Sequence, residues 1–295
     1  MSELPLSEKI VFAAVLITYF AAAIAGILQL RPTGERFKHC LLPLIALGVS
    51  FEAILLILRA VEIKAIPLTG LFESMIVLTA MFGMIYLFFT IAIKQVWFGS
   101  VLSWIIFFTV ALAAAVARPA SEPNEVAARP WAVVHGIAMI LSGVSIMLAA
   151  ASAMLYLFAN RSLKQKRAVQ LFGKMPNIEK LGRINQFGLK ACFVLMTFGL
   201  ASGIGLAATS SGTLGIDVID WLTDAKIVLI GAVWLLLAVI LLLGHIGAVK
   251  MKHNAYITII AFILILFAVV GTTLFCGTKH NFNRQDNNTA EVKDK

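Results

Sequence analysis

Long apolar stretches alternate with short polar segments along almost the whole chain. A membrane-spanning helix needs about 20 consecutive, mostly apolar residues. Eight stretches meet this requirement: residues 10–30, 40–60, 69–93, 97–117, 131–159, 186–208, 225–247 and 255–277. Because a backbone in hydrocarbon must satisfy its own amide groups, each stretch is expected to be an α-helix. The pattern predicts an all-α bundle of eight transmembrane helices in one membrane domain, residues 1–280, followed by a polar, disordered tail, residues 281–295.

The composition excludes a soluble globular protein. The chain is 60% hydrophobic and 13% charged, with a mean hydropathy of +0.94. A soluble domain of this composition would expose far more apolar surface than water tolerates. The first apolar stretch is too long for a secretory signal, and the residues before it carry both signs of charge. We therefore expect it to remain as the first helix, and the protein to be embedded in a lipid bilayer.

Charge sets the expected orientation. Positively charged loops remain in the cytoplasm, and the segment 160–185 carries seven basic residues against one acidic residue, Glu179. If this loop is cytoplasmic, both termini lie outside, and the outer segments 118–130 and 209–224 are neutral or acidic. The net charge of +9 therefore reflects topology, and no nucleic-acid partner is expected. The seven basic residues are Arg161, Lys164, Lys166, Arg167, Lys174, Lys180 and Arg183.

Two histidines reach the same face on this topology. His135 lies at the outer end of the helix predicted over 131–159, and His280 lies just beyond the outer end of the last helix. Two neutral imidazoles on opposite sides of an iron are a common way to hold haem. Each histidine alone is also typical of an interfacial residue bonded to water or backbone, so this alternative stays open.

An aromatic and charged group lies near these histidines in the predicted topology. Trp131 opens the fifth predicted helix, and Trp221, Asp224 and Lys226 end the outer segment before the seventh. A planar ligand that carries carboxylates would suit an aromatic face beside a cation. Tryptophans are also typical of the interfacial aromatic belt, and Asp224 with Lys226 is typical of an ordinary helix start.

The three cysteines, Cys40, Cys192 and Cys276, form no CxxC pair, and no CxxCH motif is present. The chain is therefore not expected to carry a c-type haem covalently. The cysteines are best interpreted as small apolar side chains.

Several segments resemble the cytochrome c assembly family (CcsA/CcmC-like), in particular its HemX-like branch. The segment 66–74, IPLTGLFES, is similar to that family's PLSNLYES signature. Residues 176–181 and 193–203 are similar to its LPSLEELxRL and GFPLLTLGIxxG runs. Residues 221–226, with Trp234, resemble a reduced tryptophan-rich WWD segment, and 255–280 resembles the last helix with its closing histidine. The resemblance covers roughly residues 40–282.

The resemblance implies that haem is handled at the outer membrane face. Two outer histidines then act as axial ligands to haem b, and His135 and His280 match their positions. The aromatic segment with Trp221 would present the haem. Location in the bacterial inner membrane is implied as well. Attachment of haem by a lyase activity would require a partner subunit with a large extracytoplasmic domain.

This chain departs from the family at two places. Glu52 stands where some members have the first of two intramembrane histidines, and His245 is the nearest candidate for the second. At 1.5 Å per residue the two differ in depth by about 13 Å, which is too far for a shared iron. A carboxyl in mid-membrane is a functional candidate, so Glu52, Glu73 of the 66–74 signature and His245 are retained as intramembrane polar candidates. The WWD segment also lacks most of its tryptophans, which puts presentation of haem for attachment in doubt.

Three functions follow from this reading. The first is an assembly factor that holds haem between His135 and His280. The second is a HemX-type regulator or stabiliser of haem biosynthesis that acts through the basic loop 160–185. The third is a transporter that uses Glu52.

Overall fold

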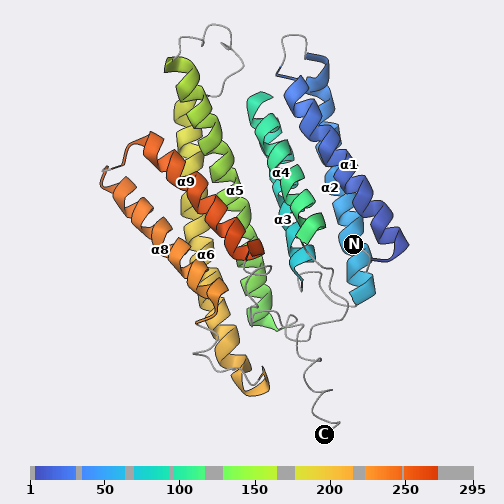
Figure 1. The fold of residues 1–295 in the computed structure, drawn as a ribbon, viewed down its shortest axis with the longest axis vertical. Coiled ribbons are helices and arrows are strands. Elements are labelled where there is room, and N and C mark those ends of the chain that lie inside the picture. The colour runs from blue at the N-terminus through green and yellow to red at the C-terminus, as the bar shows by residue number, and fades with distance from the viewer. Residues whose placement is uncertain are drawn as a thin grey trace.

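The computed structural model describes residues 4–30, 35–63, 70–92, 96–116, 129–164, 177–214, 223–247 and 249–271. Within these ranges eight helices are long and apolar enough to cross a membrane, which confirms the predicted all-α fold (Figure 1). The helices are α1 (Leu6–Leu28), α2 (Glu35–Ile63), α3 (Leu71–Ala92), α4 (Val96–Val116), α5 (Pro130–Lys164), α6 (Ile178–Leu214), α8 (Ala225–His245) and α9 (Met251–Leu266), and α9 continues into a π-helical turn, η3 (Phe267–Gly271).

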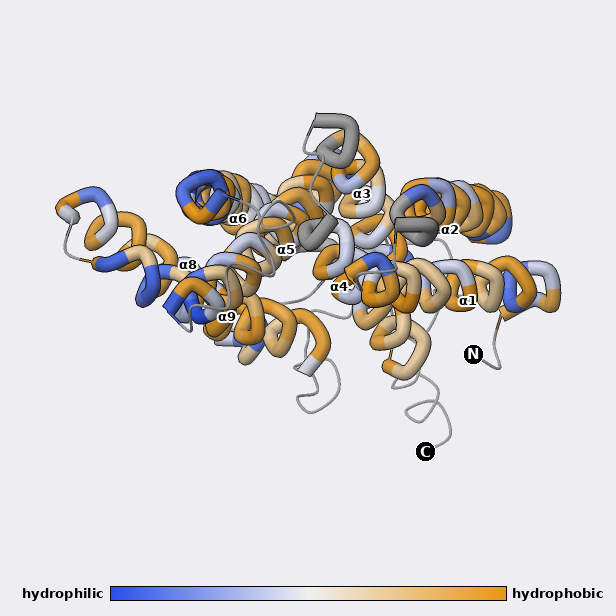
Figure 2. Tube along the Cα trace, turned by 90° about the horizontal axis from the view of Figure 1, so that it is seen from above, coloured by the Kyte–Doolittle hydropathy of each residue, from blue (hydrophilic) through white to orange (hydrophobic). Residues whose placement is uncertain are grey.

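Consecutive helices run in opposite directions, as single crossings of a membrane require (Figure 1). The first residues of α1, α3, α5 and α8 therefore lie toward one end of the bundle. Apolar residues also cover much of its outside (Figure 2), and large side chains such as Phe88 and Leu6 are more than 70% exposed. A surface of this kind is suited to lipid, so the chain is a multi-pass membrane protein.

The bundle packs around two apolar cores that share α5. One core lies mainly among α1 to α5 and also includes Leu181 of α6 and Val270 of η3, and the other joins α5 with α6, α8 and α9. Small residues on α5, including Ala149 and Ala153, are fully buried and let α6 approach closely. Gly188 of α6 lies against this surface, where a Cβ atom would be 2.8 Å from the Ser145 carbonyl oxygen.

The segment 160–185 contains more helix than its charge suggests. α5 extends through Lys164 and α6 begins at Ile178, so the helical spacing of Ile178, Leu181 and Ile184 belongs to the membrane helix itself. Leu181 is buried, and Asn185 donates hydrogen bonds to the Ala149 carbonyl at 3.0 Å and to Thr258 Oγ1 at 3.1 Å. These contacts fix the first turns of α6 against α5 and α9.

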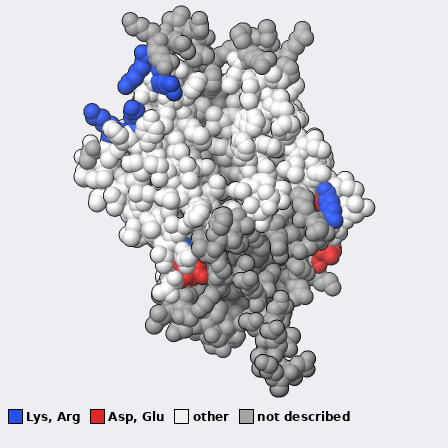
Figure 3. Space-filling model, in the orientation of Figure 1, with Lys and Arg blue, Asp and Glu red and all other residues white. Residues whose placement is uncertain are grey.

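Basic and acidic side chains are distributed unevenly along the bundle (Figure 3). Lysine and arginine gather over the end at which α5 finishes and α6 begins, whereas acidic surface lies nearer the opposite end (Figure 3). We call the first the basic end. Among the described residues, its exposed cations are Arg161, Lys164, Lys180, Arg183, Lys250 and Lys252.

The contact between α5 and α6 yields a prediction. Gly188→Ala should lower the free energy of unfolding by about 1–3 kcal/mol, because the new Cβ would meet backbone atoms that cannot rotate away. Thermal unfolding in detergent measures the change. Gly231→Ala on α8 is the matched control, since a Cβ there meets no atom within 4 Å. Equal melting temperatures for the two variants would contradict this account of the α5–α6 contact.

Candidate functional site

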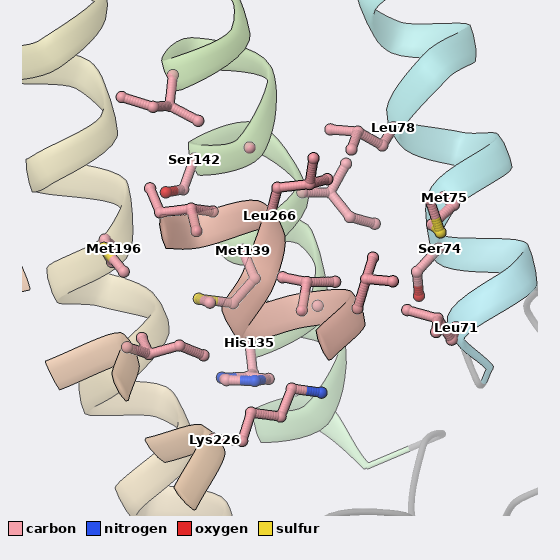
Figure 4. A pocket seen from close by; sticks show the side chains of 18 of the residues that line it. Leu71, Ser74, Met75, Leu78, His135, Met139, Ser142, Met196, Lys226 and Leu266 are labelled. Carbon is pink, nitrogen blue, oxygen red and sulfur yellow. The ribbon is translucent and has the colours of Figure 1, made fainter. Parts of the chain in front are cut away.

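A cavity of about 290 Å³ lies between α3 on one side and α5, α6, α8 and α9 on the other (Figure 4). This volume is at the lower end of the range for ligand sites, about 300–1,000 Å³. Most of the wall is apolar, and the flexible thioether side chains of Met75, Met139, Met147 and Met196 all contribute to it. Such side chains can rearrange around a bound molecule at little cost.

Two polar side chains lie together at one end of this cavity. His135 is in the second turn of α5, and Lys226 is the second residue of α8. Both helices begin toward the same end of the bundle, so the fold brings these two residues to one place, as Figure 4 shows. The cavity thus combines an imidazole, a cation and a large apolar wall.

The histidine ring has a defined tautomer. His135 Nδ1 lies 2.7 Å from the carbonyl oxygen of Gly199 on α6. A carbonyl oxygen only accepts hydrogen bonds, so Nδ1 must carry the proton, and in the neutral ring the lone pair is on Nε2. Histidines that bind metals usually donate their other N–H to a carbonyl or carboxylate in this way. In this tautomer Nε2 is the ring nitrogen that can act as an acceptor.

Gly199 has a role that its sequence pattern does not show. The spacing to Gly203 indicates only close helix packing, and packing is part of its role, because a Cβ at Gly199 would be 2.6 Å from Met139 Sδ. In addition, its carbonyl orients His135, and Gly203 lines the cavity. A backbone carbonyl leaves no signature in the sequence, so only the packing of α6 on α5 could reveal this contact.

The other predicted outer residues are placed as follows. Trp131 is 48% exposed, and its ring packs over Gly205 of α6, outside the lining of the cavity. Asp224 caps α8, since its Oδ1 accepts a hydrogen bond from the Lys226 backbone N–H at 2.9 Å. The helix-start interpretation of Asp224 is thus confirmed. Trp221 and His280 lie outside the described residues.

Trp234, assigned to the reduced WWD segment, joins two helices. Its ring stacks on Phe193 with 5.4 Å between the centroids, and its Nε1 donates to Thr197 Oγ1 at 2.8 Å. Both partners belong to α6. Within the described residues Trp234 therefore connects α8 to α6 and does not line the cavity.

The intramembrane polar candidates separate into two places. Glu52 is fully buried, where Tyr19 Oη lies 2.6 Å from its Oε2 and Thr79 Oγ1 lies 2.5 Å from its Oε1. Glu73 is also fully buried, and it pairs with Arg59. His245 is exposed in the last turn of α8, across the bundle from α2 in both Figure 1 and Figure 2. Glu52 and His245 therefore do not meet, as their predicted depths indicate.

The cap of α8 can be tested separately from any ligand. Asp224→Ala should lower the free energy of unfolding by about 1 kcal/mol, because the hydrogen bond to the Lys226 N–H is lost. Asp224→Asn keeps a capping oxygen and should retain the stability of the parent. Thermal unfolding of the two variants makes the comparison, and a loss of the same size in both would show that the charge matters more than the cap.

Comparison with known proteins places these elements in a family. The model of the family described as cytochrome C assembly protein matches residues 68–278, which is more than half of the chain. The matched range runs from the residues just before α3 through η3, and it includes His135, Gly199 and Lys226. α1 and α2, with Glu52 and Arg59, precede it. A search of curated proteins finds no match. The chain belongs to the cytochrome c assembly protein family, and it is a multi-pass membrane protein with a role in cytochrome c biogenesis.

Proposed function

We propose that this protein holds haem at the outer face of the bacterial inner membrane for delivery during cytochrome c assembly. His135 is one axial ligand, and His280 is the other. The observation that carries the proposal is the 2.7 Å hydrogen bond from His135 Nδ1 to the Gly199 carbonyl, which makes Nε2 the nitrogen that would bind iron. Haem is the cargo of this site and is passed on.

The chemistry of the cavity suits haem b. A porphyrin is a large, flat, apolar ring that carries two carboxylates and binds iron at its centre. The apolar wall can accept the ring, and methionines such as Met139 and Met196 can adjust to it. Lys226 offers a cation to a propionate at the same end as His135. The iron, the ring and one of the two propionates thus each have a matching side chain.

The topology supports the second ligand. Positive charge gathers at the basic end, which by the positive-inside rule faces the cytoplasm. His135 lies toward the opposite end, and α9 runs in the direction of that end before the chain continues to His280 (Figure 1). Both termini are then extracytoplasmic. Delivery or attachment of haem would involve another membrane subunit with a large extracytoplasmic domain, with any lyase activity belonging to the two together.

A regulator of haem biosynthesis remains the second candidate function. It is favoured by the exposure of Arg161, Lys164 and Lys180 at the basic end, far from His135 along α5. In that case a cytoplasmic partner would bind through these cations. Replacing the three by glutamine would abolish co-purification of the partner while haem content stays unchanged.

The ligand assignment gives a spectroscopic prediction. His135→Ala and His280→Ala should each remove the visible spectrum of low-spin, bis-imidazole haem in the purified protein, because one axial ligand is lost. Absorption spectra of the reduced protein, at equal protein concentration, measure the effect. His39→Ala and His253→Ala are controls, since both side chains are exposed toward the basic end. A parent protein that binds haem with an unchanged spectrum in both test variants would eliminate this site.

The cation can be tested with a modified ligand. Lys226→Met should weaken haem retention about 10- to 150-fold, because a charge-assisted hydrogen bond of this kind contributes about 1.5–3 kcal/mol. Lys226→Arg should retain most of the affinity. Haem dimethyl ester, which has no free carboxylates, should bind parent and Lys226→Met equally. If Lys226→Met weakens the binding of haem and of haem dimethyl ester to the same extent, Lys226 acts through packing and not through a propionate.

A further inference from the structure

α3 separates the cavity from the first two helices. Gly70, Leu71, Ser74, Met75 and Leu78 line the cavity. Glu73 and Thr79 do not line the cavity and instead contact α2, since Glu73 accepts from Arg59 and Thr79 donates to Glu52. α3 is therefore a wall with the cavity on one face and buried polar contacts on the other.

The first polar contact is a buried ion cluster that joins three helices. Arg59 of α2 donates from Nε and Nη2 to Glu73 Oε1 of α3, at 3.0 and 2.8 Å, and from Nη1 to Glu8 Oε2 of α1, at 3.2 Å. All three side chains are at most 3% exposed. The planar guanidinium fixes the direction of both partners, which a point charge such as lysine cannot do.

The second polar contact lies about 9 Å further along α3, because Thr79 follows Glu73 by six residues. Thr79 Oγ1 lies 3.0 Å from the Met75 carbonyl and 2.5 Å from Glu52 Oε1, while Tyr19 Oη lies 2.6 Å from Glu52 Oε2. Tyr19 of α1 and Thr79 of α3 both donate to the Glu52 carboxyl of α2, so Glu52 links the three helices. Two contacts at different heights hold both the tilt and the rotation of α3.

The opposite face of α3 has no comparable directional contact among the cavity-lining residues. Leu78 lies so close to α5 that a Cβ at Gly143 would be 3.0 Å from its Cδ1, and Met75 is a flexible thioether. Apolar contacts are not directional, so they resist compression but do not hold the wall at one distance. The directional contacts of Glu73 and Thr79, in contrast, join α3 to α2.

We propose that Arg59 and Glu52 are positioning residues that set the width of the His135 cavity by holding α3. Neither touches the cavity, and both precede the residues matched by the family model. The predicted effect on haem rests on the proposed function. The predicted effect on the position of α3 does not, because that position can be measured without a ligand. Under this proposal α1 and α2 help to shape the site. Glu52 then acts as a hydrogen-bonding residue and not as the transport residue considered from the sequence.

The ion cluster is tested by replacing it with apolar residues. The triple variant Glu8→Leu/Arg59→Met/Glu73→Leu should fold, because a buried ion cluster can often be exchanged for apolar side chains of similar volume. The probe is the rate at which N-ethylmaleimide modifies Ser74→Cys in the cavity wall. This rate should rise about tenfold, which corresponds to about 1.4 kcal/mol in opening free energy. The native cysteines are first changed to alanine: Cys40, Cys192 and Cys276.

The Glu52 contact is tested by a pair of variants. Glu52→Gln should leave the thiol reaction rate within about twofold of the parent, because an amide can accept from Tyr19 and donate to Thr79. Glu52→Leu can do neither, and it should raise the rate in the same way as the triple variant. Haem retention should fall about tenfold wherever the thiol rate rises, as expected for about 1.4 kcal/mol.

A matched control uses a polar contact that does not reach α3. Gln29 Nε2 donates to Ser100 Oγ at 2.9 Å between α1 and α4, with both side chains buried. The double variant Gln29→Leu/Ser100→Ala should leave thiol rate and haem retention unchanged. The proposal is overturned if the control shifts the thiol rate as much as the test variants, or if a folded triple variant, with a normal melting temperature, reacts as the parent does.

The two proposals fail in different ways. If the thiol rate rises in the test variants but the parent protein binds no haem, the positioning role stands and the haem function is wrong. If His135→Ala removes haem but thiol rate and haem retention are unchanged in both test variants, the haem site stands and α3 is positioned by other contacts.

Discussion

A polar group inside a membrane has no water to pair with, so its partner must come from the protein itself. In this bundle many hydroxyl groups bond to a carbonyl of their own helix, whereas several larger polar side chains find their partners on neighbouring helices. Arg59 binds carboxylates of α1 and α3, Asn185 binds groups of α5 and α9, and His135 binds a carbonyl of α6. Apolar packing lets helices slide and rotate, whereas these contacts are directional. They therefore decide which helices stay together and at what angle.

These contacts divide the bundle into two parts. Those of Arg59, Glu52 and Gln29 join helices among α1 to α4. Those of His135 and Asn185 join helices among α5, α6 and α9. The cavity lies where the parts meet, and its wall there is apolar and rich in methionine. Under the proposed function this seam would admit the flat haem ring, and its methionine side chains could adjust to it because they are flexible.

The family model matches the part of the chain that lines the cavity. It begins just before α3 and includes every helix that lines the cavity, whereas α1 and α2 precede it. The residues that touch a ligand in the cavity would thus all lie in the matched part of the chain. α1 and α2 support that part from behind α3, and the side chains that do so, Glu8, Glu52 and Arg59, are each at most 3% exposed.

The sequence by itself determined the helices, because the requirement for about 20 apolar residues is local and each stretch satisfies it alone. It also pointed to His135 and to Glu52 and Glu73 as unusual groups, and the observed start of α8 agrees with the capping chemistry expected of Asp224. It missed the extension of α5 and α6 into the basic segment, since buried contacts of Leu181 and Asn185 outweigh the polar appearance of that stretch. Only the tertiary structure decided that Gly199 orients His135, that Lys226 joins His135 in one cavity, and that Arg59 fastens α3. These contacts join residues far apart in the chain, and their geometry depends on how helices pack, which no local pattern of residues records.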